Sequence, residues 1–514
     1  MSEDSFKKRY LFKLLANLVG FVFNIITQAI VPRALGPKAY GDFGFLSNFF
    51  TQFVGFLDMG TSTCFYTKLS GKQNDFILLR FYGCFVVIVS IVTLVFVFIT
   101  HAFNLQNHIW PDQRILYVYL AAVWGILMWV SGIFNLMADA YGLTVATEKA
   151  RILQRTLGLA LILLLFAIGQ LNLGQFFIYH YVILFFLAGG FIYIFGKAGK
   201  SLNKIWIPPS RTDVSKYFKD FYLFSHPLFL ASLFALVAGI FDRWILQVAA
   251  GSLQQGFYTL SYQIGAMCFL FTGAMAPLLL REFSIAHAKQ DPRQMAVLVR
   301  RYFPALYTIA AFFACFIALQ ADKVIYIFGG KQYEDALIPV MIMAFYPIHQ
   351  TYGQLTASLF FATGQTALYR NIGIVFLIVG LPLTYFLIAP ANKMGLNAGA
   401  MGLAIKMVML NILAVNVQLY FNAKQLNLNF LRYLAHQIIS VAALLSIAFV
   451  SVAVMDHFLF FNGNVIASFM LSGCAYTGLV ACLIFLFPPI CGITRADIVS
   501  VAHKVSAMIG WKVR

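Results

Sequence analysis

The chain has 514 residues, of which 61% are apolar and only 11% are charged, and its mean hydropathy is +0.82. Soluble domains carry about 25% charged residues, so this composition excludes an ordinary soluble fold. The net charge of +18 is high enough for a nucleic-acid-binding protein. The basic residues instead follow a membrane topology, described below, and we exclude nucleic acid as a partner.

Long apolar runs follow one another along the whole chain. A helix needs about 20 apolar residues to cross a hydrocarbon core of about 30 Å. Lipid offers no partners for backbone polar groups, so each run is expected to be helical. We expect about fourteen such helices, near residues 12–31, 43–66, 79–101, 115–140, 152–171, 176–196, 224–248, 257–280, 302–321, 336–361, 371–389, 396–421, 434–455 and 465–487. The predicted fold class is all-α, a polytopic integral membrane protein.

The two halves of the chain align with each other at a shift of about 215 residues. About six apolar runs lie between matched points, and this even number makes both copies face the same way in a membrane. The matched pairs are Gly36 with Gly251, Gly41 with Gly256, Arg155 with Arg370, and Gly158 with Gly373. Parallel repeats of this kind are typical of transporters whose substrate site lies where the repeats meet.

The repeat divides the chain into four expected segments. The ranges are 1–198 for a first six-helix lobe, 199–223 for a basic cytoplasmic linker, 224–421 for a second six-helix lobe, and 422–514 for two additional helices and a cytoplasmic tail. The longest expected outer loop, about 322–335, is too short for an extramembrane catalytic domain.

Basic residues are distributed unevenly between the two sides of the predicted membrane. If the N-terminus is cytoplasmic, most of the 36 lysines and arginines fall on cytoplasmic segments. The outer loops then hold only Arg33, Lys38, Arg114, Lys323, Lys331 and Lys393. This asymmetry follows the positive-inside rule and places both termini in the cytoplasm. The basic inner side is also suited to contact anionic membrane lipids.

The sequence contains no pattern typical of an enzyme. Its seven cysteines lack the spacing of a metal site or a disulfide framework. No nucleophile, histidine and carboxylate occur at catalytic spacing, and no nucleotide-binding motif is present. We therefore expect a transporter without catalytic residues, metal or cofactor, driven by a proton or sodium gradient.

Four charged residues within expected spans are the strongest functional candidates. They are Asp242 and Arg243 in the seventh run, Lys406 in the twelfth, and Asp58 in the second. A charge at the middle of a bilayer costs about 2.5–3.5 kcal/mol, so it usually faces water or a partner. Arg243 and Lys406 are predicted to bind an anionic substrate, because arginine suits phosphate. Asp242 and Asp58 are predicted either to couple an ion or to serve as structural charges.

Polar residues in two other spans are weaker candidates. Asn24 and Gln28 lie four residues apart on one helical face, together with Asn17. Such a stripe either joins helices or contacts substrate. His349 follows Pro347 in the tenth run and is either a coupling-proton site or a packed, hydrogen-bonded histidine.

Several short motifs resemble those of the polysaccharide transporter family, which includes the O-antigen-type lipid-linked oligosaccharide flippases. This family shares a superfamily with the MATE drug exporters. The resemblance covers about residues 9–421. It rests on Leu35-Gly36-Pro37 with Tyr40-Gly41, on Leu57-Asp58-Met59-Gly60, on Pro227, Asp242-Arg243, Gly256 and Tyr258, and on Phe328-Gly329 with Tyr333.

The resemblance implies a MATE-like fold of two six-helix lobes with two extra helices. It also implies translocation of an undecaprenyl-pyrophosphate-linked oligosaccharide, such as an O-antigen unit, to the outer leaflet of a bacterial inner membrane by alternating access. Asp242 and Arg243 would then be functional positions, with Asp242 holding Arg243 in place. Membrane lipids and other polysaccharide assembly proteins are the expected partners of a monomeric chain.

Three alternatives remain at this point. A drug exporter of the same fold would favour an acidic interior for cationic drugs, whereas the deep charges here are more basic. A membrane polymerase or ligase would need a larger outer loop. A scaffold explains neither the repeat nor the buried charges.

Overall fold

The computed structural model describes residues 6–71, 75–200, 211–458 and 464–492, and in these ranges it is helical without strands. The helices are α1 (Phe6–Asp58), α2 (Thr61–Gly71), α3 (Phe76–Ala102), α4 (Gln106–Ile109), α5 (Ile115–Ala140), α6 (Thr144–Ala167), α7 (Leu173–Lys197), α8 (Arg211–Ser225), α9 (Phe229–Ala266), α10 (Leu270–Ala288), α11 (Pro292–Leu319), α12 (Ala321–Phe328), α13 (Leu337–Met343), α14 (Tyr346–Ala362), α15 (Thr366–Ile388), α16 (Gly399–Gln425), α17 (Phe430–Phe458) and α18 (Val465–Leu486).

The all-α membrane fold predicted from the sequence is confirmed. In the described ranges, 11 helices are long and apolar enough to cross a membrane. The chain is therefore a multi-pass membrane protein, and the number of fourteen spans stays a prediction.

Two of the long helices are interrupted at matched positions of the repeat. Within α1, Gly36 has φ 74° and ψ 166°, and within α9, Gly251 has φ 74° and ψ −177°. Only glycine adopts this backbone region readily, because a Cβ atom would clash. Each glycine therefore joins two helical arms in a sharp bend, where the sequence predicts turns between separate spans.

Part of the second half of the chain differs from the expected spans. The run 336–361 forms two helices, α13 and α14, which are separated just before Pro347. Proline has no N–H to continue a helix, so α14 begins with Pro347 in its first turn. The expected outer loop 322–335 is also helical, since α12 and a 3₁₀ segment (Lys331–Ala336) occupy it.

The described chain divides into two compact units. Unit 1 comprises residues 1–259 and 381–399, and unit 2 comprises residues 260–380 and 400–514. The lobe boundaries expected from the sequence stay a prediction. Residues 201–210 of the expected linker, the final 22 residues of the expected tail (493–514), and residues 1–5, 72–74 and 459–463 lie outside the described ranges.

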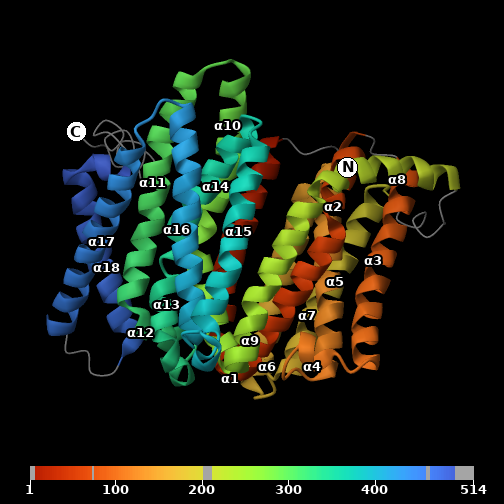
Figure 1. Cartoon of the computed structure of the whole chain (residues 1–514), viewed down its shortest axis with the longest axis horizontal. Coiled ribbons are helices and arrows are strands. Elements are labelled where there is room, and N and C mark those ends of the chain that lie inside the picture. The colour runs from red at the N-terminus through yellow and green to blue at the C-terminus, as the bar shows by residue number, and fades with distance from the viewer. Residues whose placement is uncertain (1–5, 72–74, 201–210, 459–463, 493–514) are drawn as a thin grey trace. The chain divides into compact units, whose positions relative to one another are not determined.

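Unit 1 contains two aromatic cores, and its helices are shown in Figure 1. α5 packs against α1, α3 and α7, and α6 packs against α1 and α7. One core surrounds the fully buried Trp110, and another surrounds Phe65 and Tyr82, whose rings stack at 4.2 Å. α8 lies across the ends of α2 and α3 and is fixed there by an ion pair between Lys68 and Asp220, 2.7 Å long.

Unit 2 is centred on α11, which contacts α10, α14 and α17. Its core contains the fully buried Tyr307 and Tyr352, whose ring centroids are 4.6 Å apart. The turn after α18 docks on this core, because the carbonyl oxygen of Ile490 accepts hydrogen bonds from Thr308 Oγ1 (2.9 Å) and His436 Nε2 (2.6 Å). The helix pair α17 and α18 is thereby joined to the rest of the unit.

Candidate functional site around Arg243

The bent helices α1 and α9 touch backbone to backbone just beyond their bends. A Cβ atom on Gly41 would lie 1.9 Å from the carbonyl oxygen of Ser252, and one on Gly256 would lie 1.9 Å from the carbonyl oxygen of Pro37. The shift that matches Gly41 with Gly256 also matches Pro37 with Ser252. The two contacts are therefore the same contact made twice, as a two-fold axis between repeats requires.

Arg243 lies on α9 beside this crossing and is held by the second arm of its own helix. Its Nη1 donates to Gln255 Oε1 at 3.1 Å and to Thr259 Oγ1 at 2.9 Å. Its guanidinium carbon lies 4.3 Å from the centre of the Tyr258 ring, within the range of a cation–π interaction. Gln255 Nε2 donates in turn to the backbone carbonyl of Arg243. These contacts hold the guanidinium of Arg243 against the second arm of α9, beyond the bend at Gly251.

The first repeat contains a hydrogen bond at the matching positions, in the opposite direction and without the charge. Tyr40 OH donates to Gln28 Oε1 at 2.8 Å, and these two residues match Gln255 and Arg243 at the repeat shift. Gln28, which the polar stripe on α1 predicts as a site residue, therefore aligns with Arg243 of the second repeat. One repeat supplies a neutral pair and the other supplies a cation.

Asp242 and Lys406 are held by different parts of the fold. Asp242 Oδ1 accepts a hydrogen bond of 2.8 Å from Thr384 on α15, within unit 1. Lys406 belongs to unit 2 and is 7% exposed. Its side chain runs past Gly380, where a Cβ atom would lie 3.2 Å from Lys406 Cε. Gly380 therefore leaves room for a buried lysine on α16.

Asp58 is the last residue of α1, and α2 begins at Thr61. The residue is 9% exposed, and its carboxylate accepts from Thr61 Oγ1 (2.9 Å), the backbone N–H of Ser62 (3.1 Å) and Ser62 Oγ (2.8 Å). Met59 and Gly60, which follow it, both have positive φ. These contacts place the carboxylate at the first turn of α2, where it accepts from a backbone N–H as a capping side chain does.

The remaining predicted residues differ from one another in their surroundings. Asn24 and Asn17 on α1 are exposed. His349 on α14 packs in unit 2, with its ring 5.9 Å from that of Tyr307. Its buried Nδ1 makes no hydrogen bond within the described residues.

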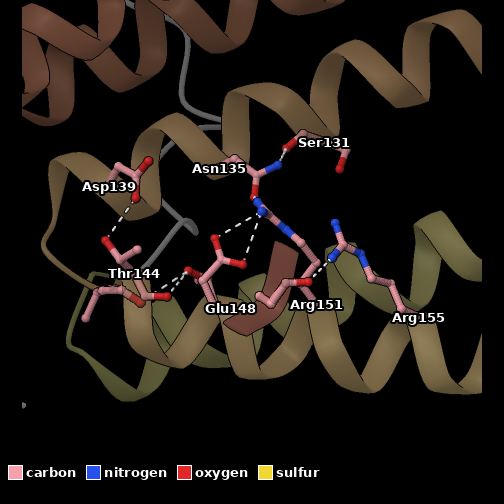
Figure 2. Close-up of polar contacts among 10 residues, drawn as sticks. Ser131, Asn135, Asp139, Thr144, Glu148, Arg151 and Arg155 are labelled. Atoms are coloured by element: carbon pink, nitrogen blue, oxygen red, sulfur yellow. Dashed lines mark hydrogen bonds and ion pairs between the residues drawn. The ribbon is translucent and has the colours of Figure 1, made fainter. Parts of the chain in front are cut away.

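A charged cluster between α5 and α6 was missed by the sequence analysis. Glu148 is 2% exposed, and both its oxygens accept from Arg151 Nη1, at 3.0 and 3.2 Å. Figure 2 shows Arg151 between Glu148 and Asn135, to whose side-chain oxygen it also donates. One turn further on, Arg155 donates to the backbone carbonyl of Ala16 on α1. The cluster therefore joins α1, α5 and α6.

The sequence gives only a weak indication of this cluster. Glu148 and Arg151 are spaced for an ion pair on one helical face, but near a helix start such a pair usually faces solvent. Only the positions of α1 and α5 show that the glutamate is buried.

Comparison with protein families and known structures identifies the relatives of this fold. A family model described as "Polysaccharide biosynthesis protein" matches residues 6–278. Among curated protein sequences, none matches this chain.

Three solved structures illustrate the likeness. The lipid II flippase MurJ, in an inward closed conformation, has a TM-score of 0.65 at 12% identity, covering 92% of this chain and 98% of that chain. An inward-facing MATE-family multidrug resistance transporter has a TM-score of 0.60 at 16% identity, covering 81% and 98%. A MOP superfamily transporter from Pyrococcus furiosus has a TM-score of 0.54 at 15% identity, covering 83% and 97%. At these identities the likeness shows a shared fold.

Proposed function

The chain belongs to the polysaccharide biosynthesis protein family, and from this premise we propose that it is a flippase for a lipid-linked oligosaccharide. The cargo is a glycan joined through pyrophosphate to undecaprenol, such as an O-antigen unit. It moves from the inner to the outer leaflet of a bacterial inner membrane, with both termini of the protein in the cytoplasm.

The position of Arg243 is the observation that carries this proposal. A cation in a membrane-spanning helix is costly unless it has a partner or a function. Its guanidinium is oriented by Gln255 and Thr259 and stacked on Tyr258. Oriented arginine is well suited to bind the phosphate oxygens of a pyrophosphate, because its planar N–H groups match phosphate geometry.

The other predicted residues fit subsidiary roles in the same proposal. Lys406 contributes a second cation for phosphate or an acidic sugar, and Asn24 and Gln28 contribute polar contacts to the glycan. Asp242, held by Thr384, and His349 are candidate groups for coupling to a proton or sodium gradient. The transport cycle is alternating access between the repeats, in a monomer that cooperates with other polysaccharide assembly proteins.

A transport assay in vesicles tests the role of Arg243. The purified protein is reconstituted with a lipid-linked oligosaccharide labelled on its sugar, and a membrane-impermeant lectin reports the fraction in the outer leaflet. We expect Arg243→Gln to slow transport about tenfold or more, because one lost charge-assisted interaction is worth about 1.5–3 kcal/mol.

Arg281→Gln is the matched control, since Arg281 is exposed and its ion pair with Glu282 lies at the surface. It should transport at the rate of the unmodified protein. Normal transport by a folded Arg243→Glu variant would refute the assignment of Arg243.

A multidrug exporter is the second candidate, because MATE-family structures share the fold. The drug susceptibility of a deletion strain separates the two functions. If the protein is a flippase, the deletion strain should lose its surface polysaccharide and keep its drug tolerance. If it is an exporter, the strain should keep the polysaccharide and lose drug tolerance.

A further inference from the structure

One side of the helix α8 is docked on the rest of unit 1. Tyr217 and Phe221 lie four residues apart, on one face of the helix, and are 8% and 6% exposed. Tyr217 OH donates to Asp75, the N-cap of α3, and the ring of Phe221 lies 5.2 Å from that of Phe81 on α3. Together with the ion pair of Asp220 described above, these contacts hold α8 against the ends of α2 and α3.

Another side of the same helix exposes large apolar residues. Phe218 is 63% exposed, Tyr222 55% and Leu223 62%. The rings of Phe218 and Tyr222 stack on each other, with their centroids 6.3 Å apart. Successive residues of a helix point about 100° apart, which places the exposed Lys219 between Tyr222 and Leu223 around the helix. We call Phe218, Lys219, Tyr222 and Leu223 the exposed side of α8.

The docking of α8 places it where α3 begins. α3 is one of the helices that are long and apolar enough to cross a membrane. Its exposed residues include Ile88, Ile91 and Phe98, which face lipid in a spanning helix. Tyr217 binds the N-cap of this helix, and Figure 1 shows α8 running across the helix ends. The exposed side of α8 therefore lies near the level at which α3 enters the hydrocarbon.

The charges of α8 favour a membrane surface over a protein as the group that covers this side. A contiguous set of exposed apolar side chains marks a contact with protein or membrane. The sequence of α8 contains Arg211, Lys216 and Lys219 against Asp213 and Asp220, and Asp220 is already paired with α2. Helices that combine aromatic rings with lysines lie at the boundary between headgroups and acyl chains and bind anionic lipids.

We propose that the exposed side of α8 binds anionic phospholipid in the expected cytoplasmic leaflet. Phe218 and Tyr222 enter the boundary between headgroups and acyl chains, and Lys219 contacts the lipid phosphate. Only a 3₁₀ turn (His226–Leu228) separates α8 from α9, so lipid bound here anchors the start of the helix that carries Arg243. The surface does not depend on the identity of the transported cargo.

Photochemical crosslinking from α8 tests this surface. A benzophenone amino acid replaces Phe218 in the full-length protein, which is reconstituted in nanodiscs with equal amounts of phosphatidylcholine and phosphatidylglycerol. After irradiation, mass spectrometry identifies the molecule attached at this position. We expect lipid adducts in which phosphatidylglycerol exceeds phosphatidylcholine about fivefold, the ratio that one lysine near an anionic headgroup provides.

Matched probes and substitutions make the test specific. The same amino acid at Ile91, which is 54% exposed on α3, should give lipid adducts without a headgroup preference. Lys219→Gln should lower the preference at position 218 about fivefold. Lys289→Gln removes an exposed lysine from unit 2 instead, and it should leave the preference at position 218 unchanged.

Two results would overturn the proposal. The first is a probe at position 218 that attaches only to protein, within the chain or in a second copy, while the probe at Ile91 attaches to lipid. The second is equal attachment to both lipids that Lys219→Gln does not change, which would show a contact with acyl chains alone. Transport is not measured in this experiment, so failure of the flippase assignment would leave its result intact.

Discussion

Arg243 differs from its repeat partner Gln28 in charge, although each is hydrogen-bonded to the residue twelve positions further along, Gln28 as the acceptor and Arg243 as the donor. Repeats descended from one unit keep their backbone geometry. A charge at one of two matched positions can therefore make the crossing of α1 and α9 asymmetric without changing the fold. Because only one repeat carries the cation, the anionic group of the cargo is expected to bind in one orientation.

A substitution at Gly44 tests whether Arg243 needs its hydrogen bond to Thr259. A Cβ atom on Gly44 would lie 2.3 Å from Thr259 Oγ1, the atom that accepts from Arg243. We expect Gly44→Ala to displace Thr259 and to reduce transport about tenfold in the vesicle assay. Gly55→Ala on the same helix is the control, because no atom lies within 4 Å of the added methyl group. Equal transport by the two variants would show that Thr259 does not position Arg243.

Asp58 is expected to matter for stability. In Asp58→Ala the N-terminus of α2 loses the acceptor for Ser62 N–H and for two hydroxyl groups. We expect a loss of about 2 kcal/mol, the upper range for a side chain that caps a helix N-terminus. Asp291→Ala, at the surface-exposed start of α11, should cost about 1 kcal/mol or less. Thermal unfolding of both variants compares them, and the predicted order would be contradicted if Asp291→Ala were the less stable.

At the residue scale, Asp242, Arg243 and Lys406 could be identified from the sequence, because charges are rare in apolar runs and their insertion into a membrane is costly. It could not identify Gln255 and Thr259 as the partners of Arg243, since they lie beyond the bend at Gly251. It also missed Glu148, because a charge near a helix end is usually solvated. Partners that meet through tertiary packing leave no periodic pattern in the sequence.

At the scale of elements, the glycine pair of the repeat was the most informative pattern. Gly36 and Gly251 share a φ of 74°, and the turns predicted at both positions are bends within long helices. The division of 336–361 into α13 and α14 was less predictable, since Pro347 is compatible with a kinked helix as well as with a break.

The shared conformation predicts a shared energetic effect. Gly36→Ala and Gly251→Ala each place a Cβ atom in a backbone region nearly exclusive to glycine, at a cost of about 1–3 kcal/mol. Both variants should therefore lower the unfolding temperature by similar amounts. Gly373→Ala is the control, since it lies within the helix α15, with no atom near its Cβ position, and it should be neutral or slightly stabilising. A destabilised Gly36→Ala beside an unaffected Gly251→Ala would argue against equivalent bends.

At the scale of the whole molecule, the distribution of basic residues predicts the orientation in the membrane. Lysines and arginines near the cytoplasmic leaflet gain about 1 kcal/mol each from its anionic surface. Lys289 and Arg293 flank the α10–α11 connection, and Arg300 and Arg301 follow within α11. The connection between α15 and α16 contains one lysine, Lys393. The first connection is therefore expected in the cytoplasm and the second outside.

Reporter insertion at these two connections measures the orientation. Gln290 and Met394 both lie in short turns, and Met394 is 88% exposed, so an inserted domain should leave the helices intact. A fluorescent protein inserted at Gln290 should be fluorescent, and alkaline phosphatase inserted there should be inactive, because this enzyme needs an oxidising compartment for its disulfides. Insertions at Met394 should give the reverse result. Phosphatase activity at Gln290 without activity at Met394 would invert the topology, and Arg243 would then meet its cargo from the opposite side of the membrane.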